Sequence, residues 1–230
     1  MNYVYEDLPT HQKRMECLLD ECGERLLAHV PIRPRHVLCV ARTDGLLPKM
    51  IIDARREALP FRVTGVTKNF NAVTRARNIC TELRGVGVPM NPEDFHICRG
   101  GPNTYGQGHM HLHDIAFFIP LLNTKEGAGA EENLQLSLMN ACNRCIGALE
   151  VGGRLVLVLC NPVHSLTQIF REECLRTIDT SLVYRRMRTC AHEVLQIHGL
   201  SVPGQLNREA SEMFTSCELI VADKPPQRYS

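Results

Sequence analysis

Histidines and cysteines stand at two places in this chain with spacings that could do chemistry. His109, His111 and His113 alternate, so a strand would place their imidazoles on one face, where they could bind Zn²⁺. Cys142 and Cys145 have the Cys-x-x-Cys spacing of a redox pair. No cysteine lies beside the histidines to complete a tetrahedral site, and both cysteines fall on the apolar stripe of an expected helix. We therefore predict no metal site, and we expect both cysteines to pack in the core.

The segment 184–188 combines three arginines with a tyrosine. Guanidinium groups bind phosphates through paired hydrogen bonds, and an aromatic ring can stack on a base. The alternative is a solvated strand edge that its charge protects from pairing. Because the chain has 26 Lys and Arg against 25 Asp and Glu, this patch is the main electrostatic support for RNA binding. We predict RNA contact through Arg185, Arg186 and Arg188.

The composition describes a chain that can bury one substantial core. It has 230 residues, of which 44% are hydrophobic. Many of its eleven cysteines lie inside apolar runs, which is typical of a reducing compartment rather than of a secreted disulfide scaffold. The N-terminal residues carry acids early, and no apolar run is long enough to span a bilayer. We expect an intracellular protein, cytoplasmic or nuclear, with no membrane partner.

Apolar spacing alternates between strand and helix along the chain. Strands are expected at residues 36–41, 61–66, 95–98, 114–122, 155–160, 182–187 and 213–222. Helices are expected at residues 11–30, 47–58, 71–84, 131–149 and 164–175. This order predicts an α/β fold, with a mostly parallel seven-stranded sheet and helices on both faces. We expect residues 1–35 to form an N-terminal helical extension, 36–222 the domain and 223–230 a tail.

Ligands bind beyond the carboxyl ends of the strands in such sheets. The candidate site is therefore formed by residues 41–45, 67–71, 99–108 and 119–124. The turn after the first strand brings backbone N–H groups and a helix N-terminus to the ligand, and glycines there allow a close approach. Here Ala41 and Thr43 occupy the positions where a Gly-x-Gly is expected.

In order and layout, the chain resembles the Rossmann-like S-adenosylmethionine-dependent methyltransferases over nearly its whole length. Residues 149–156, Leu-Glu-Val-Gly-Gly-Arg-Leu-Val, are similar to the helix, tight Gly-Gly turn and strand found late in that fold. The resemblance implies S-adenosylmethionine as the cofactor. The residues that it implies for cofactor binding are Ala41, Thr43, Asp44 and Gly45 after the first strand, and Thr67, Lys68 and Asn69 after the second.

Residues 208–214 resemble the Ser-Arg-x-x-Ser-x-Glu-x-Tyr ending of the FtsJ-like ribose 2′-O methyltransferases, one residue short between Ser and Glu. That family uses a Lys-Asp-Lys-Glu tetrad, whose charges lower the cost of removing the 2′-hydroxyl proton. The resemblance implies candidate catalytic residues, namely Lys13, Asp114 and Glu212. The acid position at the end of the fourth strand holds Ile119 and the second lysine position holds Val158, so we expect no 2′-O transfer by that mechanism.

A second likeness is to the rRNA uridine-N3 methyltransferases. Residues 40–44, 76–83 and 114–120 are similar to that family's first turn, its Ala-x-x-Asn-x-x-x-Leu helix and its Phe-x-Phe-Pro strand end. This resemblance implies a target base near Phe118, Pro120 and Asn123.

Two functional hypotheses remain open. The first is an S-adenosylmethionine-dependent RNA methyltransferase, with RNA or a ribonucleoprotein as its partner. The second is a catalytically inactive methyltransferase-fold module that docks to a protein partner or a ribonucleoprotein. The second is favoured by the missing Gly-x-Gly, by the incomplete tetrad and by Thr67-Lys68-Asn69 where an acid normally binds the ribose hydroxyls. A metal-dependent hydrolase that uses the histidine run is a third alternative.

Overall fold

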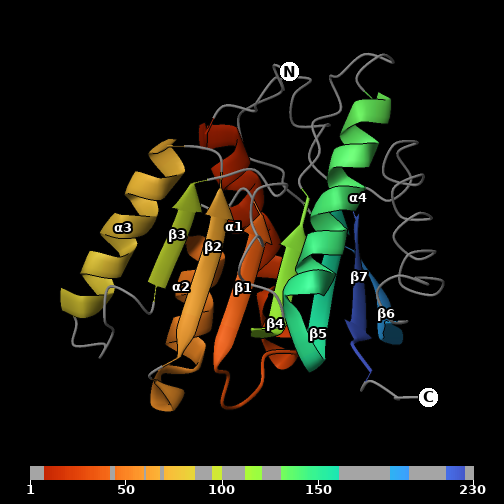
Figure 1. The fold of residues 1–230 in the computed structure, drawn as a ribbon. Helices are drawn as coiled ribbons and strands as arrows, with labels where there is room; N and C mark the ends of the chain where they lie inside the picture. The colour runs from red at the N-terminus through yellow and green to blue at the C-terminus, as the bar shows by residue number, and fades with distance from the viewer. Residues whose placement is uncertain are drawn as a thin grey trace.

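Near-continuous apolar runs form the central strands of the sheet in the computed structural model (Figure 1). The structure describes residues 8–41, 45–59, 61–67, 70–85, 95–99, 112–120, 131–160, 187–196 and 216–225. Within these ranges, seven strands form one sheet in the order β3-β2-β1-β4-β5-β7-β6. They are β1 (His36–Ala41), β2 (Arg62–Thr67), β3 (Phe95–Arg99), β4 (His113–Ile119), β5 (Leu149–Cys160), β6 (Arg188–Gln196) and β7 (Ser216–Asp223). β1 to β5 run parallel and β7 lies antiparallel between β5 and β6, so the predicted mostly parallel α/β fold is confirmed.

Helices cover both faces of this sheet. They are α1 (Leu8–Ala28), α2 (Leu46–Ala54), α3 (Phe70–Gly85) and α4 (Glu131–Ala148), with a short 3₁₀ helix η1 (Arg56–Ala58) after α2. Figure 1 shows α1 and α2 behind the sheet, α4 in front of it and α3 beside β3. None of the helices in the described ranges is long and apolar enough to cross a membrane.

The two layers of helices take up alternate residues of each strand, because successive side chains of a strand point to opposite faces. Val37 and Cys39 of β1 pack in the core cluster that contains α1 and α2. Leu38 and Val40 pack in the cluster that contains α4. A strand that is apolar at every position is therefore buried on both sides, which explains the unbroken apolar run at residues 37–41.

The N-terminal helix belongs to the core of the domain. In α1, Met15, Leu18 and Leu26 are fully buried, in a cluster with residues of β1 and β4. The expected division at residue 35 is therefore not a boundary between an extension and a domain.

The C-terminal boundary also differs from the expected one. Lys224 follows β7 and is only 5% exposed. Its ammonium donates hydrogen bonds to the carbonyl oxygens of Ile146 (3.0 Å) and Leu149 (2.6 Å), at the end of α4. The last carbonyls of a helix have no partner within the helix, so Lys224 supplies a charged donor where α4 ends and β5 begins. Residues 223–225 are part of the domain rather than of a tail.

β5 differs from the prediction at its start. The strand begins at Leu149, directly after α4, and Gly152 and Gly153 lie inside it. The β4–β5 register shifts after His113, and Gly152 has a φ of 81°. A Cβ on Gly153 would lie 3.0 Å from the carbonyl oxygens of Glu150 and His113. The two glycines therefore form an irregularity within a strand, and not the expected helix-to-strand turn.

The sixth strand lies later in the chain than expected. β6 spans Arg188–Gln196, whereas the prediction was 182–187, a range in which only Met187 is described. β6 is an edge strand that packs Ala191 and Leu195 against the core and leaves His192 and Val194 exposed. Its apolar content is low because one face meets solvent, so its sequence lacks the continuous run that marks the central strands.

Candidate functional site at the carboxyl ends of the strands

The strand order reverses between β1 and β4. In doubly wound sheets, ligands bind in the crevice beyond the carboxyl ends of the strands at this point. Ala41 lies opposite Ile119, so β1 and β4 end at the same level. β2 ends at Thr67, beside them, because Val40 of β1 lies opposite Val66. The structure thus brings the ends of both predicted cofactor-binding strands to one edge of the sheet.

Gly45 supplies a backbone conformation suited to a ligand-binding turn. It has a φ of 98° and a ψ of 0°, in the left-handed region that residues with a side chain rarely adopt, and it is buried. It is also the N-cap of α2, and its carbonyl oxygen accepts a hydrogen bond from the backbone N of Lys49 at 2.9 Å. A helix N-terminus directs backbone N–H groups and a partial positive charge toward this end of the sheet.

Ala41 and Thr67 are the other predicted cofactor-binding residues within the described ranges. Each is the last residue of its strand, and the two strands are neighbours. Thr43, Asp44, Lys68 and Asn69 lie outside the described residues, so their contact with a cofactor stays a prediction.

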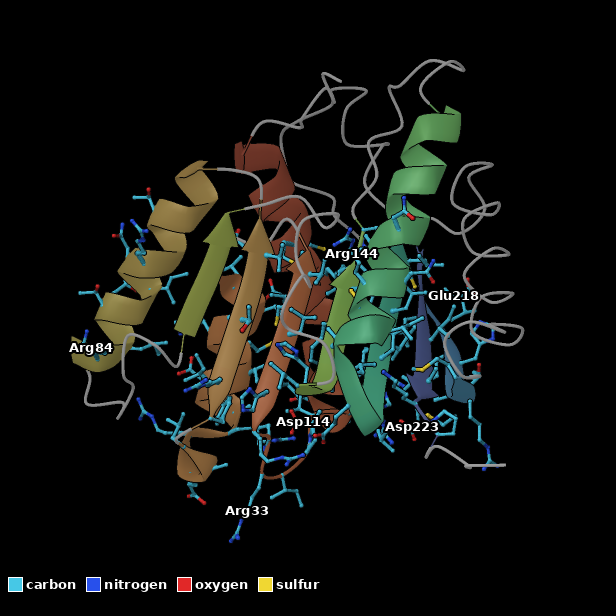
Figure 2. The ribbon with its side chains drawn as sticks, in the orientation of Figure 1. Arg33, Arg84, Asp114, Arg144, Glu218 and Asp223 are labelled. Atoms are coloured by element: carbon cyan, nitrogen blue, oxygen red, sulfur yellow. The ribbon has the colours of Figure 1, made fainter. Side chains whose placement is uncertain are left out.

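Asp114 lies at the opposite end of the sheet from this site (Figure 2). Its carboxylate accepts hydrogen bonds from the backbone N of Arg35 (2.8 Å) and of His36 (2.9 Å). These two bonds fix the start of β1 against the start of β4. Parallel strands carry all their amino ends to one edge, so the length of β4 separates this carboxylate from the candidate site. We therefore correct its predicted catalytic role to a structural one.

Phe118 and Pro120 lie at the site end of β4, but neither is open to a ligand. Phe118 is 3% exposed, packs in the cluster that contains α4 and lies opposite Leu157 of β5. Pro120 is also buried. A ring buried in the core cannot stack on a base, so the predicted contact of Phe118 with a target base is corrected to core packing. Asn123 lies outside the described residues.

Arg188 is far from the candidate site. It opens β6 opposite Asp223 of β7, which lies opposite Arg154 of β5. Arg154 in turn lies opposite Ile115, near the amino end of β4. Arg188 is therefore exposed at the amino edge of the sheet, which corrects its predicted place in the substrate site. Arg185 and Arg186 lie outside the described residues.

The remaining catalytic predictions can be placed only in part. Lys13 lies in the first half of α1, and its side chain is outside the described part of the structure, as is all of Glu212. The structure shows another glutamate at the start of β7. Ser216-Cys217-Glu218 has the Ser-x-Glu spacing of the FtsJ-like ending without a missing residue. The apolar run that follows Glu218 directly was the sequence signal that could have found it.

Glu218 is a buried carboxylate at the level of the site. It lies opposite Leu159 of β5, two residues beyond Leu157, which lies opposite Phe118 of β4. Glu218 is 2% exposed, and its Oε1 bonds to Nε2 of His192 on β6, whose side chain is 39% exposed. A carboxylate that holds one imidazole nitrogen orients the ring and leaves the other nitrogen to donate or accept a proton. The pair thus places a hydrogen-bonded imidazole and carboxylate at the same end of the sheet as the candidate site.

Those histidines and cysteines of the two motifs that the structure describes are buried in the core. His113 is buried, with Nδ1 3.3 Å from the carbonyl oxygen of Ala148, and its ring lies edge-on to that of His36. Cys142 and Cys145 are buried in the cluster that contains α4, as predicted. His109 and His111 lie outside the described residues.

Comparison with known proteins identifies the fold. No family model and no curated protein matches the chain. A solved structure of the complex between the Haloferax volcanii Trm112 methyltransferase activator and the putative methyltransferase is similar to it, with a TM-score of 0.61 at 13% identity over 99% of this chain and 100% of that one. The chain has a methyltransferase fold.

Two further structures with the methyltransferase fold are similar to this chain over most of its length. An rRNA methylase from Streptococcus thermophilus gives a TM-score of 0.54 at 16% identity, over 98% of this chain and 100% of that one. The N-methyltransferase NodS from Bradyrhizobium japonicum WM9, in complex with S-adenosyl-L-homocysteine, gives 0.54 at 11% identity, over 94% of this chain and 87% of that one. The resemblance to the FtsJ-like methyltransferases stays a prediction.

Proposed function

We propose that the protein binds S-adenosylmethionine at the carboxyl ends of β1 and β2 and transfers its methyl group to RNA. The conformation and position of Gly45 are the main support for this proposal. It is a buried, left-handed glycine that caps α2 where the strand order of a methyltransferase fold reverses. A residue with a side chain would be strained there. This backbone conformation requires glycine and lies at the point where such sheets bind ligands. It therefore supports the proposal that the turn binds a ligand.

The described residues fit this cofactor in two respects. The backbone of Gly45 lets the turn between β1 and α2 pass close to a ligand, and the N-terminus of α2 favours a negatively charged or oxygen-rich group. Ala41 and Thr67 end the strands that lead into the binding segments, which would hold the cofactor through Thr43, Asp44, Lys68 and Asn69. When bound, S-adenosylmethionine supplies a sulfonium methyl group to a nucleophile.

The chain's own contribution to the acceptor is the His192–Glu218 pair. Methylation of a nitrogen or oxygen that carries a proton requires the loss of that proton. His192 is exposed enough to meet a ligand, and the buried carboxylate of Glu218 holds and orients its imidazole. His192 is on β6, three strands from β4 and about 14 Å away at the usual strand spacing, so the acceptor would have to extend along the strand ends to reach the imidazole.

The similar structures support RNA and a protein partner as further parts of the proposal. One of them is an rRNA methylase, and another is a complex with the Trm112 methyltransferase activator. For this chain we therefore propose RNA or a ribonucleoprotein as the substrate class. We also propose that it binds a protein partner.

The second candidate function is a catalytically inactive docking module, and the ends of the strands favour it. Ala41 ends β1 where a glycine is expected, and Thr67, the last residue of β2, begins the segment Thr67-Lys68-Asn69 where an acid is expected. A carboxylate that binds a pair of hydroxyls contributes about 1.5–3 kcal/mol, so its absence weakens cofactor binding by about ten- to a hundredfold. Binding weakened by this amount is measurable at millimolar ligand.

Calorimetric titration with S-adenosylmethionine and with S-adenosylhomocysteine tests the cofactor proposal. Gly45→Ala is the site variant and Gly152→Ala its matched control, because the two glycines have φ of 98° and 81°. Each alanine carries a strain of about 1–2 kcal/mol in the left-handed region. Gly152, however, is exposed near the amino end of β5, and nothing lies within 4 Å of a Cβ placed there. We expect saturable one-to-one binding, which Gly45→Ala weakens by about tenfold or more and Gly152→Ala leaves unchanged.

A different experimental result would refute each part of the proposal. No heat and no thermal stabilisation with either ligand would remove cofactor binding and leave the docking module. Equal weakening in both glycine variants would show a general effect of strain and remove the placement at Gly45. Cofactor binding without methyl incorporation into total cellular RNA would remove RNA as the acceptor.

A further inference from the structure

The thiols of Cys22 and Cys217 meet in the core, although 195 residues separate them in the chain. Cys22 lies on α1 and Cys217 on β7, and their sulfurs are 3.5 Å apart. Both residues are buried, at 2% and 0% exposure. Two elements from opposite ends of the sequence therefore place two sulfurs in direct contact.

The packing around the two thiols keeps them together. α1 and β7 share one core cluster, in which Cys22 and Cys217 both lie. One turn further along α1, Arg25 forms an ion pair of 2.6 Å with Glu193 on β6, the strand beside β7. A disulfide has an S–S length of about 2.05 Å, so the sulfurs, 3.5 Å apart, must approach by about 1.5 Å to form one.

The two thiols are not equivalent to the other described cysteines. A hydrogen bond with the Cys217 thiol lowers the pKa of Cys22, against the opposing effects of its burial and of Glu21. The thiols whose pKa is instead raised, mainly by burial, are Cys17, Cys39, Cys145 and Cys190. Since the thiolate is the reactive form of cysteine, Cys22 is the favoured nucleophile among these side chains.

We propose that Cys22 and Cys217 are a redox modification site, at which hydrogen peroxide drives the formation of a reversible intramolecular disulfide between α1 and β7. The oxidant must be small, because both sulfurs are almost completely buried. Peroxide would reach the pair through the small local openings that folded proteins undergo without global unfolding.

The chemistry is balanced by one molecule of peroxide. The Cys22 thiolate attacks a peroxide oxygen and the O–O bond breaks. Hydroxide is the leaving group, and Cys22 becomes a sulfenic acid. The Cys217 sulfur then attacks the Cys22 sulfur, the S–O bond breaks, and water leaves with the proton from Cys217. Two thiols are oxidised to one disulfide, and the peroxide is reduced to two molecules of water.

The positions of the two cysteines in the chain determine how the disulfide affects the stability of the fold. Cys217 lies opposite Cys160, the last residue of β5, so the disulfide forms at the carboxyl end of the sheet. It closes a loop that contains nearly the whole chain, and a cross-link over a long loop restricts the unfolded state strongly. Oxidation therefore stabilises the fold, and reduction reverses the effect.

Peptide mapping after peroxide treatment tests the proposal on the full-length reduced protein. Free thiols are blocked after the reaction, and the protein is digested without reductant. We expect a cross-linked peptide pair containing Cys22 and Cys217, a mass lower by two hydrogen atoms, and full recovery of both thiols with dithiothreitol. The matched variants are Cys22→Ser and Cys190→Ser, since Cys190 is an exposed thiol on β6. Cys22→Ser should abolish the cross-link and Cys190→Ser should retain it.

A second measurement separates the proposal from a failure of the variants to fold. The urea midpoint of the wild-type protein should rise after peroxide treatment and return to its original value after reduction. Retention of both thiols, or a mixture of linkages among other cysteines, would overturn the proposal. A urea midpoint that oxidation leaves unchanged or lowers would overturn it as well.

Discussion

Replacing Asp114 by asparagine tests whether this carboxylate holds the fold together or takes part in catalysis. Its two oxygens accept the backbone N–H groups of Arg35 and His36, at 2.8 and 2.9 Å. In Asp114→Asn one oxygen becomes an NH₂ group, which faces a donor and cannot accept. One charge-assisted bond is lost and one N–H is left without this acceptor, a cost of about 1–3 kcal/mol. For a chain of this size, that cost lowers the melting temperature by about 2–4 °C per kcal/mol.

Urea unfolding followed by circular dichroism measures this effect. Asp53→Asn is the matched control, because Asp53 accepts from Lys49 at 2.7 Å on the exposed face of α2. An exposed pair of this kind contributes about 0.3–0.5 kcal/mol. Asp114→Asn should lower the free energy of unfolding several times more than the control and leave S-adenosylhomocysteine binding unchanged. A variant with wild-type stability that has lost methyl transfer would refute the structural role and restore the catalytic one.

Two further predictions concern the end of α4 and the end of β7. Lys224→Met should lower the free energy of unfolding by about 1–3 kcal/mol in urea, because the carbonyls of Ile146 and Leu149 lose a charged donor; Lys49→Met on the surface is the control, and an equal effect of both would contradict the prediction. Hydrogen bonds from Arg154 lower the pKa of Asp223 in the folded protein. The ionised carboxylate therefore stabilises the fold fully above the unfolded-state pKa of about 3.9. This contribution is lost as the pH falls through the lower folded-state pKa. Thermal melts between about pH 5 and 2 should therefore show a smaller loss of stability for Asp223→Asn than for the wild-type protein, and parallel curves would disprove the coupling.

The central strands could be predicted from the sequence because each is buried on both faces. β1 and β4 are apolar at nearly every position, and their bounds agree closely with the pattern. β6 could not be found in this way, because this edge strand alternates half-buried and exposed residues from Ala191 to Leu195 and has no buried run. The start of β5 was missed for a different reason. Two adjacent glycines usually end an element, and only the pairing with β4 and with Lys224 shows that the strand passes through them.

The candidate site was predictable at the level of strand ends and not at the level of side chains. Gly45 could be placed because a glycine after the first strand has a specific conformational use. The role of Asp114 depends on which end of β4 it occupies, and the sequence did hold this information, since Asp114 precedes the apolar run. The His192–Glu218 pair could not be predicted, because it requires the antiparallel register of two strands that 19 residues separate, from Gln196 to Ser216.

β7, the last of the described strands, occupies an interior position in the sheet, which bears on how the protein is made. β7 pairs with β5 on one side and with β6 on the other, and α1 packs against it. During synthesis, β5 and β6 therefore have no common neighbour until residue 223 has left the ribosome. Until then β5 presents an apolar edge with unpaired backbone groups, which is the kind of surface that joins to other chains. The sheet therefore cannot close until β7 has been made, and a chain that lacks this strand exposes the edge of β5 in the middle of the sheet.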